Sequence, residues 1–301
     1  MAVLEVRNVH KRFNGTPAVD DVSFMVNSGY IYGLLGPNGA GKTTTIRMIM
    51  NIILPDSGSI LLFGEAMSNH LKSKIGYLPE ERGLYPKMKV LDLLTFMGEL
   101  RGLPAIQAKE KSLSWLDRMD LRDRAQDKVE ELSKGMQQKL QIISTIIHEP
   151  DLIILDEPFS GLDPVNVNLI KNIMLEMKDR NKTIMLSTHM METAEKLCDE
   201  VLMISKGRKV LDGELKKIQT EYGKNSIHLE FEGDGRFIAS LPMVKKCDYY
   251  NNYVEIELHD SSDSNDLLKH VLDKIKVTEM HSQKSSLNEI FITLAGGGNE
   301  Q

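Results

Sequence analysis

A glycine-rich segment near the N-terminus connects an apolar run to a segment with helical spacing. Its residues, Gly36-Pro-Asn-Gly-Ala-Gly-Lys42-Thr43, match the pattern G-x-x-x-x-G-K-[ST]. The run before it, Tyr30 to Leu35, is short and apolar, and the apolar residues of Thr43 to Ile53 recur at helical intervals. This order predicts a buried strand, a tight loop and a buried helix.

Such a loop is suited to phosphate groups. Glycines at positions 36, 39 and 41 let the backbone N–H groups point inward, and the helix N-terminus adds roughly half a positive charge. Lys42 would then neutralise the β- and γ-phosphates, and the Thr43 hydroxyl would ligate Mg²⁺. A plain glycine turn is the alternative, but this pattern matches by chance in only about one chain in a hundred. The predicted nucleotide contacts are Gly36, Pro37, Asn38, Gly39, Ala40, Gly41, Lys42, Thr43 and Thr44.

A second apolar run, Leu152 to Leu155, is followed by two adjacent carboxylates, Asp156 and Glu157. Consecutive strand residues point to opposite sides, so the two acids can have different roles. Beside a bound triphosphate, Asp156 would hold Mg²⁺ and Glu157 would polarise the attacking water as general base. An isolated acidic pair at a strand end is more often a helix cap or a solvated turn. The phosphate loop makes hydrolysis the better interpretation.

The remaining pattern predicts two domains with a boundary near residue 220. Residues 1–220 combine N-terminal alternating strands with apolar strands at 183–187 and 201–204, which indicates an α/β domain. Helical spacing from Val90 to about Leu121 and from Gly135 to Ile147 predicts an inserted helical subdomain at about 85–150, and Pro164 begins a helix capped by Asp163. Residues 221–301 predict a small α+β domain. Apolar and polar residues alternate at 227–231 and 254–258, which predicts strands, and helices are expected at 266–275 and 287–294.

Composition limits the partners. The 301 residues carry a net charge of −6, which disfavours broad attraction to nucleic acid, so no nucleic-acid partner is expected. The two cysteines, Cys198 and Cys247, stand far apart and form no zinc motif. No stretch approaches the roughly 18 apolar residues of a membrane span, and the N-terminus lacks the apolar segment of a secretory signal. We expect a chain that neither spans a membrane nor enters the secretory route alone.

A third motif adds a family resemblance. Leu132-Ser-Lys-Gly-Met-Gln-Gln-Lys139 resembles the signature sequence of ABC transporter ATP-binding subunits, and with the phosphate loop and the acidic pair it extends the resemblance over residues 1–215. The resemblance implies a P-loop NTPase fold with an antiparallel β subdomain. It also implies that Ser133 and Gly135 contact the ATP bound by a second, identical or related subunit, and that ATP and Mg²⁺ are the cofactors.

The resemblance also assigns single residues. His189, at the end of a predicted strand, matches the family's switch histidine, and Asp163 lies in Ser160-Gly-Leu-Asp163, which looks like the loop along the dimer seam. Phe13 matches the aromatic that stacks on adenine, although a lone aromatic could equally be a core residue. Glu80 stands where the family more often has a Mg²⁺-ligating glutamine. Its effect on metal and nucleotide binding is open.

Lys134 and Met136 also depart from the commonest signature, and Ser285 to Phe291 closes an additional C-terminal domain. These features resemble the subgroup that serves ABC-2 type exporters, including sodium-efflux and antibiotic-export systems. The resemblance implies a cytoplasmic subunit on the inner face of the cell membrane, whose groove near Glu80 to Met88 receives a helix of an integral permease.

Three other kinds of protein could contain a phosphate loop. A soluble ABC-type ATPase with a regulatory role would resemble tandem nucleotide domains or carry long coiled coils, for which this chain has no matching sequence. A P-loop GTPase would need an aspartate to read guanine, and Asn181-Lys-Thr-Ile184 lacks it. An interaction protein with an inactive site would not need Lys42, Asp156, Glu157 and His189 together.

Overall fold

The computed structural model describes residues 2–81, 83–222, 226–251, 253–259, 262, 264–283 and 286–296. The chain divides into two compact units, Met1–Glu214 and Leu215–Gln301. The boundary predicted near residue 220 falls inside α7 (Leu215–Glu221), the first helix of the second unit. Ser285, which belongs to the C-terminal resemblance, and Arg82, in the predicted permease groove, lie outside the described residues.

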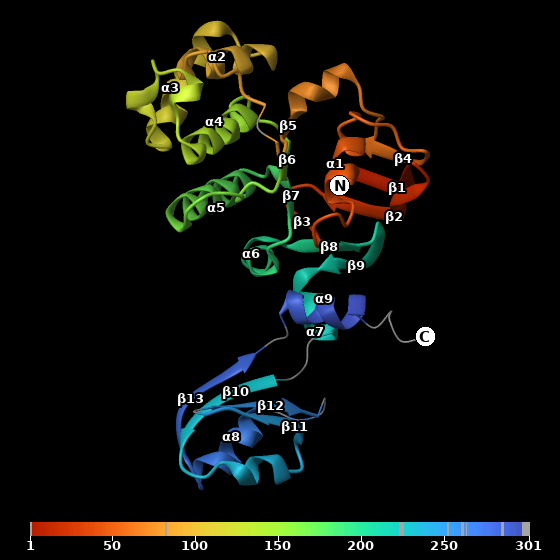
Figure 1. Cartoon of the computed structure of the whole chain (residues 1–301), viewed down its shortest axis with the longest axis vertical. Helices are drawn as coiled ribbons and strands as arrows, with labels where there is room; N and C mark the ends of the chain where they lie inside the picture. Colours follow the sequence, from red (N-terminus) through yellow and green to blue (C-terminus); the bar gives the residue numbers. More distant parts are fainter. Residues whose placement is uncertain are drawn as a thin grey trace. The chain divides into compact units, whose positions relative to one another are not determined.

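The first unit is built on a six-stranded sheet in the order β5-β6-β7-β3-β8-β9 (Figure 1). Its strands are β5 (Ile75–Leu78), β6 (Leu152–Asp156), β7 (Thr183–Thr188), β3 (Ile31–Leu35), β8 (Glu200–Ser205) and β9 (Arg208–Glu214). All neighbours pair in parallel except β8 and β9. Helices cover both faces of the parallel part, which explains why its strands read as continuous apolar runs. The predicted α/β class is confirmed.

An antiparallel sheet of three strands, in the order β2-β1-β4, completes the core of this unit. Its strands are β1 (Ala2–Phe13), β2 (Thr16–Asn27) and β4 (Ser57–Leu62). Alternate residues such as Val6, Val22 and Val26 pack against Ile46 and Ile49 of α1 in one hydrophobic cluster. The alternation in the sequence therefore predicted the N-terminal strands correctly.

The helices of the first unit largely follow the predicted spacing. They are α1 (Lys42–Ile49), α2 (Val90–Leu100), α3 (Ala105–Arg118), α4 (Lys134–Ile146), α5 (Pro164–Asp179) and α6 (Met191–Leu197), with short 3-10 turns at Asn69–Lys74, Arg122–Arg124 and Val129–Glu131. The helix predicted to reach Ile53 ends at Ile49 instead. Asn51 adopts φ +55°, and the Ile52 and Ile53 N–H groups both donate to Arg47 O at 2.9 and 3.3 Å. This left-handed residue closes the helix before the apolar pattern ends.

The second unit has an antiparallel sheet in the order β11-β12-β10-β13. Its elements are β10 (Ser226–Glu232), a 3-10 turn (Arg236–Ser240), β11 (Val244–Tyr249), β12 (Tyr253–Leu258), α8 (Ser264–Leu272), β13 (Lys276–Gln283) and α9 (Leu287–Gly296). Alternate strand residues, including Leu229 and Ile256, form a core with Leu267 and Val271 of α8. The predicted α+β composition is found here, although α8 ends three residues before Ile275.

The helices among the described residues are all too short or too polar to cross a membrane.

Gly76 in β5 fixes how closely the inserted helices approach the sheet. A Cβ atom at this position would lie 2.3 Å from the Thr145 carbonyl oxygen of α4. We expect Gly76→Ala to lower the free energy of unfolding by about 1–3 kcal/mol, since backbone must move to relieve the overlap. Gly83→Ala is the control, because nothing lies within 4 Å of its Cβ position. Equal melting temperatures for the two variants would contradict this packing.

Candidate nucleotide-binding site

The loop between β3 and α1 is pressed against two neighbouring strands. Gly36 has φ +151°, and a Cβ atom there would lie 2.2 Å from Ile204 O; Gly41 has φ +110°, with Ala18 O at 2.5 Å. Both positions therefore require glycine on two grounds, backbone conformation and space. The Gly207 N–H donates to Ala40 O at 2.9 Å and ties the turn between β8 and β9 to the loop.

The loop surrounds a cavity of about 220 Å³. The residues that line it are Ala18, Asn38, Gly39, Gly41, Lys42, Thr43, Thr44, Glu80 and Glu157. The N-cap residue of α1 is Gly41, which has no side chain to accept the first N–H groups of the helix. A helix start with open N–H groups favours an anion.

Lys42 is the central cation of this cavity. Its side chain is only 6% exposed, and Nζ donates to Gly36 O at 2.8 Å and to Pro37 O at 3.3 Å. Nζ also lies 3.5 Å from Glu157 Oε1, so the two side chains form a buried ion pair.

Glu157 follows the last residue of β6 with a left-handed backbone of φ +48°. Its N–H donates to Ser187 O at 3.0 Å, which fixes the turn beside β7. The carboxylate lies 3.0 Å from His189 Nδ1 through Oε1 and accepts the Thr188 hydroxyl at 3.4 Å through Oε2. The structure thus brings Lys42, Glu157 and His189 together, from segments that are far apart in the sequence.

Asp156 is 1% exposed, and neither carboxylate oxygen makes a hydrogen bond of good geometry within the described part of the chain. Burial raises the pKa of this carboxyl, and the negative charges of Glu80 and Glu157 raise it further. The nearby hydroxyls of Ser187 and Thr43 lower it in part. Thr43, Glu80 and Asp156, the predicted metal set, are therefore close enough to influence one another.

A buried carboxylate without a partner fits a cation, and these donors are all oxygen atoms, which Mg²⁺ prefers. No group of three His, Cys, Asp or Glu side chains is arranged for a metal among the described residues. The set therefore suits an ion that keeps several waters and binds phosphate oxygens, as Mg²⁺ does. Tyr77, which the sequence reasoning missed, is nearby: burial first, then Asp156 and Glu80, raise its pKa to about 12.

Of the predicted site residues, Gly36, Pro37, Ala40, Asp156 and His189 are not among those that line the cavity, and neither are Ser133, Gly135, Asp163 and Phe13, which lie in other segments. Ser133 is exposed and caps α4 by accepting the Met136 N–H at 3.3 Å. Gly135, in the first turn of α4, approaches Leu162, with 3.9 Å between its Cβ position and Leu162 Cδ2. Asp163 caps α5, and hydrogen bonds from Asn166 lower the pKa of its carboxyl. Phe13 lies at the end of β1, 47% exposed, with Lys11 Nζ 5.6 Å from its ring centre.

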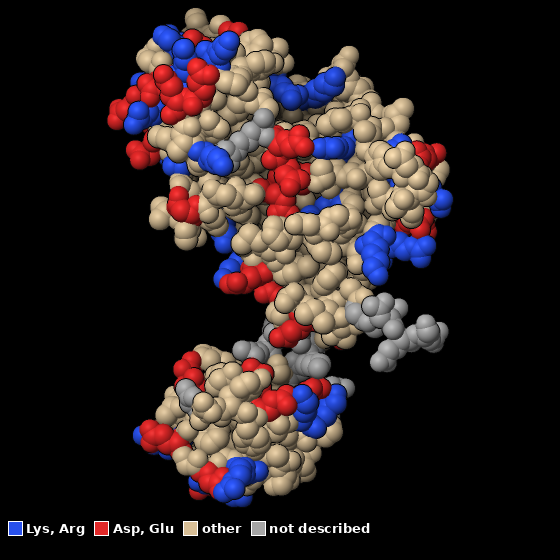
Figure 2. Space-filling model, viewed as in Figure 1, with Lys and Arg blue, Asp and Glu red and all other residues tan. Residues whose placement is uncertain are grey.

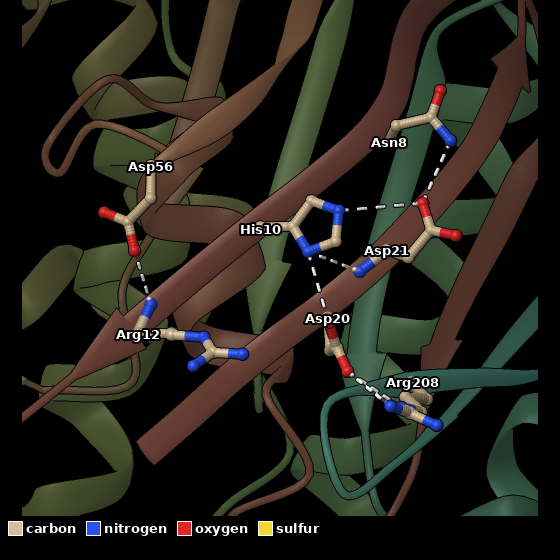
Figure 3. A network of polar contacts seen from close by, with 7 residues as sticks. All are labelled: Asn8, His10, Arg12, Asp20, Asp21, Asp56 and Arg208. Carbon is tan, nitrogen blue, oxygen red and sulfur yellow. Dashed lines mark hydrogen bonds and ion pairs between the residues drawn. The ribbon is translucent and has the colours of Figure 1, made fainter. Parts of the chain in front are cut away.

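A polar network braces the loop from the antiparallel sheet (Figure 3). Arg208, at the start of β9, donates through Nε and Nη2 to Asp20 Oδ2 at 2.9 and 2.7 Å, and these bonds lower the Asp20 pKa. His10 Nδ1 lies 3.2 Å from Asp20 Oδ1, and the Asp20 N–H donates to Gly207 O at 2.8 Å. Sequence reasoning missed this brace because its members are up to 188 residues apart.

Family models match both units. Residues 19–160 match the model described as ABC transporter, and residues 213–295 match the C-terminal domain of DrrA1-3-like ATP-binding proteins. The chain is 40% identical to the ABC transporter ATP-binding protein YhaQ of Bacillus subtilis, an alignment that covers 98% of this chain and 99% of YhaQ. This chain belongs to the ATP-binding proteins of ABC transporters. The chain is therefore an ATP-binding subunit, and its predicted family and general function are confirmed.

Further relatives share this assignment. The linearmycin resistance ATP-binding protein LnrL of Bacillus subtilis is 31% identical, with 98% of each chain covered. The Nod factor export ATP-binding protein I of Burkholderia lata is 39% identical, with 71% of each chain covered.

Solved structures confirm the ABC ATPase fold. An ATP-binding subunit of an ABC transporter superimposes with a TM-score of 0.69 at 32% identity, covering 73% of this chain and 93% of that chain. A second one, cbiO1 of Clostridium perfringens, gives a TM-score of 0.64 at 26% identity, covering 73% and 91%. The predicted fold class is thus correct.

Asp156→Asn should stabilise the nucleotide-free subunit at neutral pH. Because burial raises the pKa of Asp156, its charged form is less favourable in the folded than in the unfolded chain. That penalty is complete above the folded-state pKa and declines to zero as the pH falls from there to the unfolded value of 3.8, so the gain in melting temperature should shrink on acidification. Thermal unfolding followed from neutral pH down to the unfolded pKa measures this.

Asp163→Asn is the matched control. The pKa of Asp163 is lowered by Asn166, so its charge is favourable in the folded chain and its removal should not raise the melting temperature. A loss of stability in Asp156→Asn at pH 8 would show that the buried carboxylate has a favourable partner.

Proposed function

We propose that this subunit hydrolyses ATP as one of two nucleotide-binding halves of an exporter, and that hydrolysis drives movement of a membrane permease. The placement of Glu157 in the wall of the phosphate cavity, within reach of Lys42 and His189, supports this best. A carboxylate at that point can accept a proton from a water that attacks the γ-phosphate.

Each side chain at the site would have a defined task. The β- and γ-phosphates of ATP would replace the carbonyl groups and Glu157 as partners of Lys42, because they carry more negative charge. Glu157 would then be free to orient water, and His189 would contact the γ-phosphate. Thr43, Asp156 and Glu80 would hold Mg²⁺, which supplies charge neutralisation to the phosphate oxygens.

The proposed site is completed by a second ATP-binding subunit, identical or related. Ser133, Gly135 and Asp163 do not line the cavity of their own chain, and Ser133 and Asp163 are exposed. The start of α4 is thus available to an anion from outside the chain. In the proposed head-to-tail dimer that anion is the γ-phosphate of the partner's ATP, and Phe13 of each subunit stacks on its own adenine.

Export is the direction that the relatives favour. Their names include Nod factor export and linearmycin resistance, and the second unit matches the DrrA1-3-like C-terminal domain. We propose an ABC-2 type exporter with an integral permease, and a subunit that works in the cytoplasm on the inner face of the membrane. No nucleic-acid partner is proposed: on the face in Figure 2 the first unit has both basic and acidic side chains, and a strip of acidic side chains lies at its centre.

The permease would dock in a groove between β5 and the inserted helices. A cavity of about 180 Å³ lies there, lined by Tyr77, Leu78, Pro79, Gly83, Leu84, Met97, Arg101, Gln141, Ser144, Thr145 and His148. The predicted segment Glu80 to Met88 contributes Gly83 and Leu84 to this groove. Its position connects a docked helix through β5 to Glu80 at the nucleotide.

Glu157→Gln should retain ATP affinity and lose turnover. The amide keeps the shape of the side chain but cannot accept the proton of the attacking water, so we expect hydrolysis to fall by at least about 100-fold. Equilibrium ATP binding, phosphate release and size-exclusion chromatography with ATP would be measured, and a nucleotide-bound dimer should accumulate.

Two other variants complete that experiment. Glu192→Gln is the matched control, because Glu192 is exposed and pairs with Lys196 on the same helix, so its turnover should be unchanged. Lys42→Ala should lose ATP affinity itself. Hydrolysis at the wild-type rate by Glu157→Gln would refute the assignment of the general base.

A soluble regulatory ATPase is the alternative, and isolation of the native complex separates it from a transporter subunit. Only the transporter subunit requires an integral partner. The full chain, purified from mildly solubilised membranes, should carry a protein with several membrane spans in stoichiometric amount. Recovery of all the protein in the soluble fraction, without such a partner, would favour the regulatory role.

A further inference from the structure

The end of β7 and the residue after it form the polar run Ser187-Thr188-His189, which follows the strand next to β6, where Asp156 is the last residue and Glu157 comes directly after it. Asp156 and Ser187 are register partners on these neighbouring parallel strands, so their side chains leave the same face of the sheet. Both are buried, at 1% and 0% exposure. The pairing places Ser187 next to Asp156 of the proposed metal site, although Ser187 belongs to none of the sequence motifs.

Three atoms of this pair share one unusual property. Asp156 Oδ1, Asp156 Oδ2 and Ser187 Oγ are buried and make no hydrogen bond of good geometry within the described chain, although the Ser187 hydroxyl is near enough to lower the pKa of Asp156. Such atoms are rare in folded proteins, and each one costs stability unless a ligand or ion supplies the missing bond. Their position together indicates a ligand that reaches both side chains at once.

The other hydroxyls of β7 are accounted for within the chain. Thr183 Oγ1 accepts the Gly29 N–H at 3.0 Å, while Thr188 Oγ1 accepts the Met190 N–H at 3.0 Å and donates to Glu157. Ser187 therefore differs from the two threonines of the same strand. Hydrogen bonds that stabilise the strand account for their hydroxyls but not for the hydroxyl of Ser187.

The chemistry of the pair fits a water molecule held by a cation. A water bound to a metal uses its lone pair on the ion and has two hydrogens left to donate. The carboxylate of Asp156 and the hydroxyl oxygen of Ser187 can each accept one of them. The Thr43 hydroxyl and Glu80 act on the same carboxylate, so the cation would be the one proposed for ATP hydrolysis.

We propose that Ser187 and Asp156 together hold one water of the Mg²⁺ hydration shell, which makes Ser187 a positioning residue of the metal site. This inference rests on the proposed function, because the metal is the one that accompanies ATP. Ser187 would fix the ion without touching it, as outer partners of metal sites generally do.

The test compares Ser187→Ala with Thr183→Val in the full chain. Mn²⁺ replaces Mg²⁺, and its affinity for the complex with a non-hydrolysable ATP analogue is measured by electron paramagnetic resonance. Binding of the same analogue without metal and the melting temperature of the nucleotide-free chain are measured in parallel. These readouts do not depend on catalytic turnover.

We expect Ser187→Ala to weaken Mn²⁺ binding by about 10-fold, in the range of other outer partners of metals. Its metal-free analogue binding should be unchanged, and its melting temperature should be equal or higher because an unpartnered hydroxyl is removed. Thr183→Val should show the reverse, a lower melting temperature with unchanged Mn²⁺ affinity, since it breaks the bond to Gly29.

Unchanged Mn²⁺ affinity in Ser187→Ala would overturn the proposal, whatever its melting temperature. Failure of the proposed function looks different: the wild-type chain itself would then bind the analogue with no dependence on Mn²⁺. The wild-type titration therefore separates the two failures.

Discussion

The contact of two glycines with two carbonyl oxygens supports the rest of the site. Ile204 O and Ala18 O occupy the space that side chains at positions 36 and 41 would need. The loop is thereby held between β8 and β2, and the brace from Arg208 to Asp20 connects β2 to β9, the strand that follows β8. A loop shaped before its ligand arrives loses little conformational entropy on binding, so more of the phosphate interaction appears as affinity.

The two adjacent carboxylates of the unliganded site have different electrostatic surroundings. Glu157 has Lys42 and His189 beside it, whereas Asp156 is buried deeper, at 1% exposure, with further negative charge near it. The buried charge of Asp156 therefore lowers the stability of the unliganded subunit. A cation that accompanies the nucleotide removes this cost. Lys42 differs from Asp156, because it already has partners and a triphosphate must displace them in order to bind. In the proposed reaction the same event that satisfies Asp156 frees Glu157, which joins metal binding to activation of the base.

The sequence predicted those features that depend on the periodicity of apolar residues and on helix capping. The buried strands, the helix start at Pro164 and the order of strand, loop and helix at the phosphate loop follow from periodicity and capping, and the structure has them. The helix predicted from about Gly135 begins one residue earlier, at Lys134. Strands β4, β5, β9, β11 and β13 were not predicted, because they are short or partly polar. Ser187 and Tyr77 belong to the site through the register of β5, β6 and β7. Register across parallel strands depends on the whole sheet, so a linear pattern does not contain it.

Asp163 and Ser133, the N-caps of α5 and α4, differ in the hydrogen-bonding groups that a ligand could still use. Both carboxylate oxygens of Asp163 accept from Asn166, at 3.0 Å from its backbone and 2.5 Å from its side chain, so this residue shapes its loop and offers little to a ligand. Ser133 accepts the Met136 N–H through Oγ, and its hydroxyl proton is still free to be donated. Within the described residues, the Ser133 hydroxyl proton has no hydrogen-bond acceptor assigned to it. In the proposed dimer the γ-phosphate of the partner's ATP uses that donor, so the signature of one subunit contributes only to the reaction of the other.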